Sequence, residues 1–190
     1  MTTFRHEPDH RLDLVRQSLR HTAEAWEHGL GSALDRDLVA ARLVMRGASA
    51  RRSMLHTAHQ QLQWADSASR PVLLRRATPI DVVADLARIN RLLSQLAQSV
   101  IAVPEAGGLT GAERTGVDVA RRVGTRRLVY FADTMPRPLI DREYITAGHE
   151  LLDALADLAE CSPPRGTTPD ICLALMIRLV ETSRHATRAA

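Results

Sequence analysis

Apolar residues recur along this chain at intervals of three and four positions, which is the spacing of one face of an α-helix. The most regular series is Leu86, Ile89, Leu93, Leu96 and Val100. It follows Thr78 and Pro79, and these residue types are favoured at the cap and at the first position of a helix. The pattern therefore predicts an amphipathic helix whose apolar face packs in an antiparallel bundle.

The same criterion predicts six helices, at about residues 9–30, 35–65, 78–103, 110–134, 141–160 and 168–190. Gly29 and Gly31 are expected to end the first helix, because Gly is common just after a helix. The segment Thr110-Gly-Ala-Glu113 has the residue types of a capping box and predicts the start of the fourth helix. The sixth helix is expected to begin at Thr168-Pro169, as the third begins at Thr78-Pro79.

Each half of the chain thus has the same order of helix, turn, helix, Pro-containing turn and a final helix that starts with Thr-Pro. This duplication predicts an all-α fold of six helices, arranged as two pseudo-repeated antiparallel three-helix bundles. Pro104 and the segment Glu105-Ala-Gly-Gly108 mark the midpoint. We therefore assign residues 1–104 to the first repeat, 105–109 to a linker and 110–190 to the second repeat.

Composition agrees with a helical protein. At 190 residues the chain is long enough to bury a core without disulfides or a structural metal. Aromatic residues make up only 3%, which favours helices over sheets. No apolar run reaches the roughly 18–20 residues of a membrane span, and the N-terminal segment lacks the apolar core of a signal peptide. We therefore expect a cytoplasmic protein without membrane insertion, in which Cys161 and Cys172 are reduced thiols.

All 25 basic residues are Arg, which excludes Schiff-base catalysis by Lys and the Lys of a phosphate-binding loop. The formal net charge is only +3. An alternative function, that of an Arg-rich helical regulator that binds nucleic acid, rests on four Arg pairs. These pairs are Arg51-Arg52, Arg75-Arg76, Arg121-Arg122 and Arg126-Arg127. Nucleic acid remains the less favoured partner, because the pairs lack interleaved aromatic residues.

Three segments resemble a known family. The first spans residues 34–47 and begins Leu34-Asp-Arg-Asp37. The second is Asp85-Leu-Ala-Arg-Ile-Asn-Arg-Leu92, and the third is Ser183-Arg-His-Ala-Thr-Arg-Ala-Ala190. They are similar to the turn before the second helix, to the third helix and to the last helix of the PhoU family of phosphate-uptake regulators. In the second segment, five of eight positions agree with the family's Asp-Leu-Glu-Arg-Ile-Gly-Asp-Leu.

The resemblance implies a non-enzymatic regulator that acts through protein–protein contacts in phosphate uptake and phosphate-responsive signalling. It also implies a homodimer and two partners, a phosphate transporter ATPase and a sensor histidine kinase. The residues that we expect to bind a partner or an anion are Asp85, Arg88, Arg91, Arg184 and His185. No catalytic residue is assigned, because no nucleophile pattern accompanies them.

The chain departs from the family where family members hold metal. The resemblance implies a metal cluster bound through Glu-x-x-x-Asp, but the corresponding residues are Ala87 and Arg91 in one repeat and Val180 and Arg184 in the other. Because Arg offers no acceptor atom, we predict a protein without a metal or another cofactor. Arg91 and Arg184 are expected either to bind an anion or an acidic partner, or simply to pair with neighbouring carboxylates.

Other titratable residues have ordinary structural explanations. Asp85 and Arg88 are three positions apart and are spaced to pair on one helix face. His185 is expected to cap or pack rather than to catalyse. His56 and His59 are expected to be a solvated or packed pair rather than a metal site. The acidic residues expected to be solvated charges on the fifth helix include Glu143, Glu150, Asp153 and Asp157.

Overall fold

The computed structural model describes residues 10–67, 79–102, 109–135, 142–161 and 166–188, which form six helices and no strand. The helices are α1 (His10–Asp35), α2 (Leu38–Ser67), α3 (Pro79–Ala102), α4 (Gly111–Thr134), α5 (Arg142–Glu160) and α6 (Thr168–Arg188). The all-helical prediction is confirmed, as are the predicted starts of α3 and α6. Thr78 and most of the predicted linker lie outside the described residues. Within the described ranges, no helix combines the length and apolar character needed to cross a bilayer.

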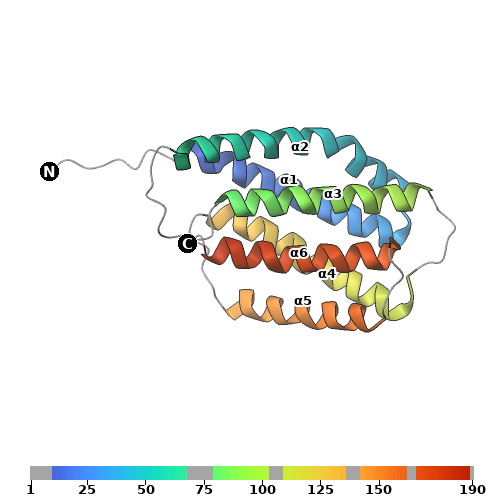
Figure 1. The fold of residues 1–190 in the computed structure, drawn as a ribbon. Helices are drawn as coiled ribbons and strands as arrows, with labels where there is room; N and C mark the ends of the chain where they lie inside the picture. The colour runs from blue at the N-terminus through green and yellow to red at the C-terminus, as the bar shows by residue number, and fades with distance from the viewer. Residues whose placement is uncertain (1–9, 68–78, 103–108, 136–141, 162–165, 189–190) are drawn as a thin grey trace.

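The helices lie in layers, and consecutive helices run in opposite directions (Figure 1). The central layers contain α1, α3, α4 and α6, in which α1 and α6 each pack against both α3 and α4. On one side α2 covers α1 and α3, and on the other side α5 covers α4 and α6. Each half is thus a three-helix unit. The halves meet mainly through α1 with α4 and α3 with α6, which are helices in equivalent positions of the two repeats.

The first helix does not end at Gly29 and Gly31, and this prediction was wrong: α1 continues to Asp35. The reason is tertiary packing. A Cβ atom on Gly29 would lie only 3.0 Å from Cδ2 of Leu93 in α3. Gly29 therefore lets α1 and α3 approach closely, and neighbouring helices hold the backbone in the helical conformation. The chain turns later, at Arg36, whose φ of 54° is left-handed.

Local capping determines where the neighbouring helices begin. The Asp37 carboxylate accepts hydrogen bonds from the backbone N–H groups of Val39 and Ala40, at 2.8 and 3.1 Å, and so starts α2. The predicted capping box of α4 is confirmed. The backbone N–H of Thr110 donates to the Glu113 carboxylate at 2.7 Å, and the backbone N–H of Glu113 donates to the Thr110 hydroxyl at 3.4 Å.

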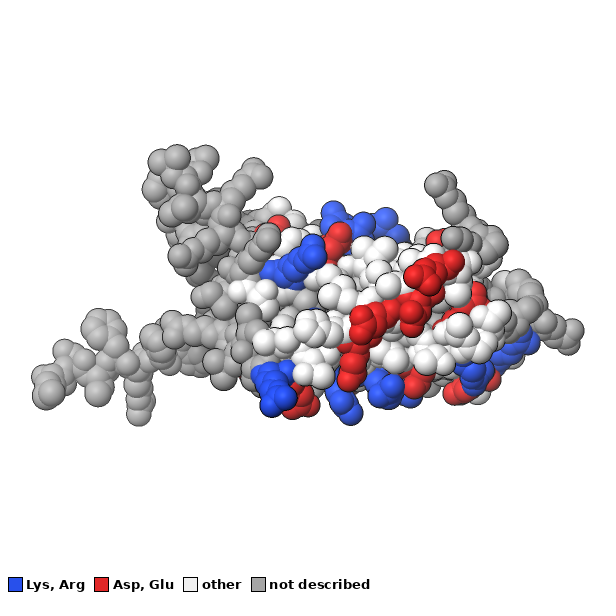
Figure 2. All heavy atoms as spheres, turned by 90° about the horizontal axis from the view of Figure 1, so that it is seen from below, with Lys and Arg blue, Asp and Glu red and all other residues white. Residues whose placement is uncertain are grey.

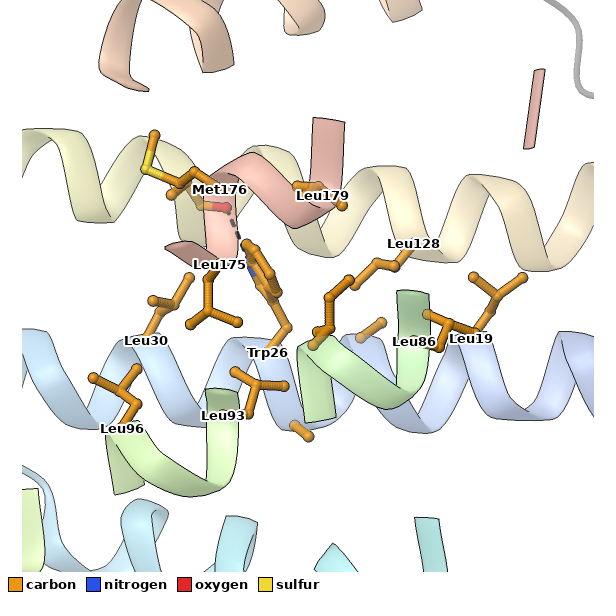
Figure 3. Close-up of a cluster of buried hydrophobic side chains, with 14 of the residues drawn as sticks. Leu19, Trp26, Leu30, Leu86, Leu93, Leu96, Leu128, Leu175, Met176 and Leu179 are labelled. Carbon is orange, nitrogen blue, oxygen red and sulfur yellow. Dashed lines mark hydrogen bonds between the residues drawn. The ribbon is translucent and has the colours of Figure 1, made fainter. Parts of the chain in front are cut away.

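A single apolar core extends through both halves. Near its centre, the fully buried Trp26 of α1 lies among Leu side chains of α1, α3, α4 and α6 (Figure 3). The indole Nε1 of Trp26 donates a hydrogen bond to the backbone oxygen of Ala120 in α4, at 3.0 Å. A Cβ atom on Gly124 would lie 2.4 Å from the indole ring. Because Gly124 has no side chain, the Trp26 indole can pack between the two halves.

Candidate functional site

Asp85, Arg88 and His185 meet where α3 packs against α6. The side chain of Asp85 is only 1% exposed. Its carboxylate oxygens lie 2.6 Å from Nδ1 of His185 and 3.1 Å from Nη1 of Arg88. Because an ionised carboxylate only accepts hydrogen bonds, Nδ1 of His185 donates in this contact. The predicted pairing of Asp85 with Arg88 is confirmed, whereas the contact with His185, 100 residues away in the chain, was not foreseen.

This cluster has the properties of a structural contact rather than of a binding site. Both carboxylate oxygens of Asp85 are engaged, and the negative charge of Asp85 opposes the binding of an anion there. Arg88 is the most exposed member, with 53% of its side chain accessible. Asp85 and His185 therefore connect the two halves of the molecule, and Arg88 pairs with Asp85 within α3.

Arg91 lies elsewhere, in a groove between α2 and α3 with a volume of about 760 Å³. We call this cavity the α2–α3 groove. Its basic residues are Arg52, His56, His59 and Arg91, and its other polar residues are Asn90, Ser94, Gln95 and Gln98. Its apolar residues are Met45, Ala48, Leu55, Val83, Ala84 and Ala87. The volume falls within the range of roughly 300–1,000 Å³ that is typical of small-molecule sites.

Helical spacing explains how the basic groups gather on one side of the groove. Arg52, His56 and His59 are four and three positions apart, so they share one face of α2. On α3, Ala84 and Ala87 line the groove, and longer side chains at these two positions would fill it. The groove is therefore open because α3 presents alanines to the α2 face that carries the two histidines.

The α2–α3 groove is electrostatically positive. None of the described residues that line it is Asp or Glu. Arg52 and Arg91 are exposed, and neither forms an ion pair with a carboxylate in the part of the chain that the structure describes. The expectation that Arg91 pairs with a neighbouring acidic residue is therefore not met among the described residues.

Asn90 makes the deep wall of the groove rigid. Its side-chain oxygen accepts a hydrogen bond from Nε of Arg51 at 2.6 Å, and its amide nitrogen donates to the Thr22 hydroxyl at 2.8 Å. Arg51 also donates to the backbone oxygen of Val44 at 2.7 Å. Burial lowers the pKa of the Arg51 guanidinium, although the nearby Glu24 carboxylate opposes this shift. Arg51 therefore acts as a connection between α2 and α3, and the neighbouring Arg52 faces the groove.

Arg184, the fifth predicted residue, is exposed on α6 and does not line the α2–α3 groove. Like Arg91, it has no ion-pair partner among the described residues. The structure thus separates the two arginines that occupy equivalent motif positions, because Arg91 lines the α2–α3 groove and Arg184 does not.

The buried Arg127 connects all three helices of the second half. Nη2 of Arg127 in α4 donates to the backbone oxygen of Tyr144 at 2.9 Å, and Nη1 donates to the Ser183 hydroxyl at 3.1 Å. Its Cζ lies 4.3 Å from the centre of the Tyr144 ring, a cation–π contact. Burial lowers the pKa of Arg127. A Cβ on Gly148 would lie 2.5 Å from Nη2, so Gly148 provides the space for this guanidinium.

The outer helices α2 and α5 carry opposite charges. The exposed arginines of α2 are Arg42, Arg46 and Arg52. The exposed carboxylates of α5 are Glu143, Glu150, Asp153, Asp157 and Glu160. Figure 2, which views the molecule from the α5 side, shows acidic residues in a band across this face. The prediction that the acidic residues of α5 are exposed is confirmed.

Neither thiols nor metal ligands form a reactive cluster in the described part of the molecule. Both cysteines are free thiols; Cys161 is exposed, whereas Cys172 is buried and its burial raises its pKa to about 12. Among the described residues, no group of three or more His, Cys, Asp or Glu side chains is placed to hold a metal ion. The α2–α3 groove is the candidate site, because it gathers basic side chains with no carboxylate among its described lining residues.

No protein-family model matches this chain, and no curated protein matches it in sequence. The assignment of the α2–α3 groove as a candidate site therefore rests on its geometry. Sequence reasoning found Arg91 but missed Arg52, His56 and His59 as members of one site. Their spacing on α2 was visible in the sequence, whereas the helix that faces them was not.

Proposed function

We propose that this protein is a non-enzymatic regulator that joins partner proteins in phosphate uptake and phosphate-responsive signalling. The phosphate part of this proposal rests on the PhoU-like segments in α3 and α6. The fold supports the adaptor part through its architecture, with six helices in two three-helix halves and with α2 and α5 on opposite outer sides.

The observation that carries an adaptor function is the difference between α2 and α5. The α2 surface combines exposed arginines with the exposed apolar residues Val39 and Leu43, which are 68% and 47% accessible. The α5 surface combines carboxylates with Ile145 and Leu152, which are 47% and 46% accessible. Apolar side chains surrounded by charges are typical of protein-binding surfaces. Two such surfaces of opposite sign suit two different partners.

The partners that the family resemblance suggests are a phosphate transporter ATPase and a sensor histidine kinase. A homodimer also belongs to this proposal. The α2 and α5 surfaces differ in the sign of their charge. Each favours a partner surface whose charge is opposite to its own, because like-charge contacts are disfavoured at interfaces. The acidic α5 face therefore suits a basic surface, and the basic α2 face suits an acidic one.

Binding to nucleic acid is less well supported, because three of the four paired arginines of α4 are engaged or buried; of these four, only Arg126 is exposed without an ion-pair partner among the described residues. Arg121 forms ion pairs with Glu27 and Asp118, and Arg122 forms one with Asp118 at 3.1 Å. The hydrogen bond from Arg121 is the main reason that the pKa of Asp118 is lowered. Arg127 is buried. Retention on DNA at physiological salt, decreasing steeply as salt rises, would support this alternative.

The adaptor proposal is tested with charge-reversed surfaces. We expect Glu150→Arg with Asp153→Arg to abolish binding of one purified partner, and Arg42→Glu with Arg46→Glu to abolish binding of the other. Affinity capture from native cells identifies the partners, and direct binding measures each interaction. Glu150→Asp with Asp153→Glu is the matched control, because it keeps the charge of the α5 surface.

Two outcomes contradict the proposal. Captured partners that include no component of phosphate transport or signalling would reject the phosphate function. Unchanged binding of every partner by both charge-reversed variants would reject α2 and α5 as adaptor surfaces. Circular dichroism of each variant establishes that the helices remain folded.

A further inference from the structure

We propose that the α2–α3 groove binds a small organic phosphate, specifically a phosphomonoester with an apolar or aromatic body. This inference does not depend on the adaptor function, because it concerns a ligand of the isolated protein. It rests on the charge of the groove, on its volume and on the division between its basic and apolar residues.

The two arginines provide the anion-binding groups. Arg52 projects from α2 and Arg91 from α3, so a ligand between the helices has a guanidinium on each side. Guanidinium groups donate in a planar fork that matches phosphate oxygens. Both side chains are exposed and have no ion-pair partner among the described residues, so binding breaks no existing salt bridge.

The surroundings reinforce this preference for an anion. No described lining residue is acidic, and His56 and His59 add two imidazoles on the same face of α2 as Arg52. The amide groups of Gln95 and Gln98 on α3 offer further donors. Asn90 is already bonded to Arg51 and Thr22, so it shapes the wall rather than contacting the ligand.

The volume and the apolar wall specify the rest of the ligand. A groove of about 760 Å³ is large enough for an organic molecule, whereas a bare inorganic anion would fill only part of it. Leu55, Val83, Ala84 and Ala87 form an apolar surface beside the basic groups. A ligand with one phosphate and one apolar body pairs its phosphate with the arginines and buries its body on this surface.

The test uses the full-length protein and three probes: 1-naphthyl phosphate, inorganic phosphate and 1-naphthol. Isothermal titration calorimetry measures each dissociation constant, without any partner protein. We expect 1-naphthyl phosphate to bind at least about tenfold more tightly than either of the other probes. The reason is that it alone supplies both the anion and the apolar body.

Substitutions of lining residues test whether 1-naphthyl phosphate binds in the α2–α3 groove. We expect Arg52→Gln and Arg91→Gln each to weaken binding of 1-naphthyl phosphate by about tenfold or more, because each removes a charge-assisted contact. Ala87→Leu should abolish binding by filling the groove without changing its charge. Arg42→Gln with Arg46→Gln is the matched control, because these exposed arginines of α2 do not line the groove and should leave the affinity unchanged.

Several results would overturn the proposal. One is the absence of 1-naphthyl phosphate binding, and another is binding that the control variant weakens as much as the two groove variants do. If inorganic phosphate bound as tightly as 1-naphthyl phosphate, the inference that the ligand carries an apolar organic body would be wrong. An acidic peptide that binds through Arg52 and Arg91 when the naphthyl ester does not would assign the groove to a protein segment. Loss of partner binding in cells leaves this measurement unaffected, so the two proposals fail independently.

Discussion

Two glycines of α4 show how neighbours determine the effect of a single residue. A Cβ atom on Gly124 would lie 2.4 Å from the Trp26 indole, which is buried and hydrogen-bonded to Ala120. At Gly111, on the first turn of the same helix, no atom beyond the adjacent residues and the local helix backbone lies within 4 Å of such a Cβ. The same substitution therefore tests packing at one position and only helix preference at the other.

We expect Gly124→Ala to lower the free energy of unfolding by about 1–3 kcal/mol, because the added methyl group must displace the indole. This loss outweighs the gain of up to about 1 kcal/mol from the greater helix preference of Ala. Gly111→Ala is the control and should change stability by less than about 0.5 kcal/mol. Urea unfolding measures both. A more stable Gly124→Ala variant would contradict the packing of Trp26 against α4.

At the scale of helices, the contact between α3 and α6 depends on the buried Asp85 carboxylate. Its partner His185 is supplied by the other half of the molecule, whereas Arg88 belongs to the same helix as Asp85. A buried carboxylate that loses a hydrogen-bond partner retains its desolvation cost. The Asp85–His185 pair should therefore be energetically coupled.

We expect His185→Ala and Asp85→Ala each to destabilise the protein by about 1–3 kcal/mol, and the double variant to be more stable than the sum of both changes predicts. Unfolding free energies in a double-mutant cycle measure the coupling. The control cycle uses Arg178 and Glu181, an ion pair within α6 whose side chains are 37% and 38% exposed, where coupling should stay below about 1 kcal/mol. Additive effects at Asp85 and His185 would show that the contact contributes no interaction energy.

At the scale of the whole molecule, the two repeats share one core. Trp26 of α1 is buried against α4, and α3 packs along α6, so separation of the halves would expose apolar surface on all four central helices. The boundary between 1–104 and 110–190 is a repeat boundary in the sequence, but the core continues across it.

We expect thermal unfolding to occur in a single transition, because neither half can lose its structure without exposing the core of the other. A Trp64→Phe variant leaves Trp26 as the sole tryptophan and as a reporter of the interface between halves; Trp64 is 81% exposed, so its replacement should be tolerated. Trp26 fluorescence and far-ultraviolet circular dichroism should give coincident transitions. A fluorescence change at a lower temperature would indicate that the halves separate before they unfold.

Sequence reasoning succeeded where the physical cause is local. The capping box of Thr110 and Glu113 and the Pro79 start of α3 involve residues within one helical turn. It failed at Gly29 because the reason for that glycine is Leu93 in another helix. The assignment of five residues to one binding function stays a prediction; the structure joins Asp85 and His185 between helices, pairs Arg88 with Asp85 within α3 and places Arg91 in the α2–α3 groove.

The sequence by itself thus determined the six helices, their order in two equivalent halves and the identity of several important charges. The spacing of apolar residues and the capping groups act over a few positions, and so they can be recognised along the chain. Only the tertiary structure decided which charges meet, because Arg51 and Asn90 are 39 positions apart and Asp85 and His185 are 100 positions apart. The positive groove exists because one face of α2 packs beside the alanines of α3, and local spacing does not encode that pairing.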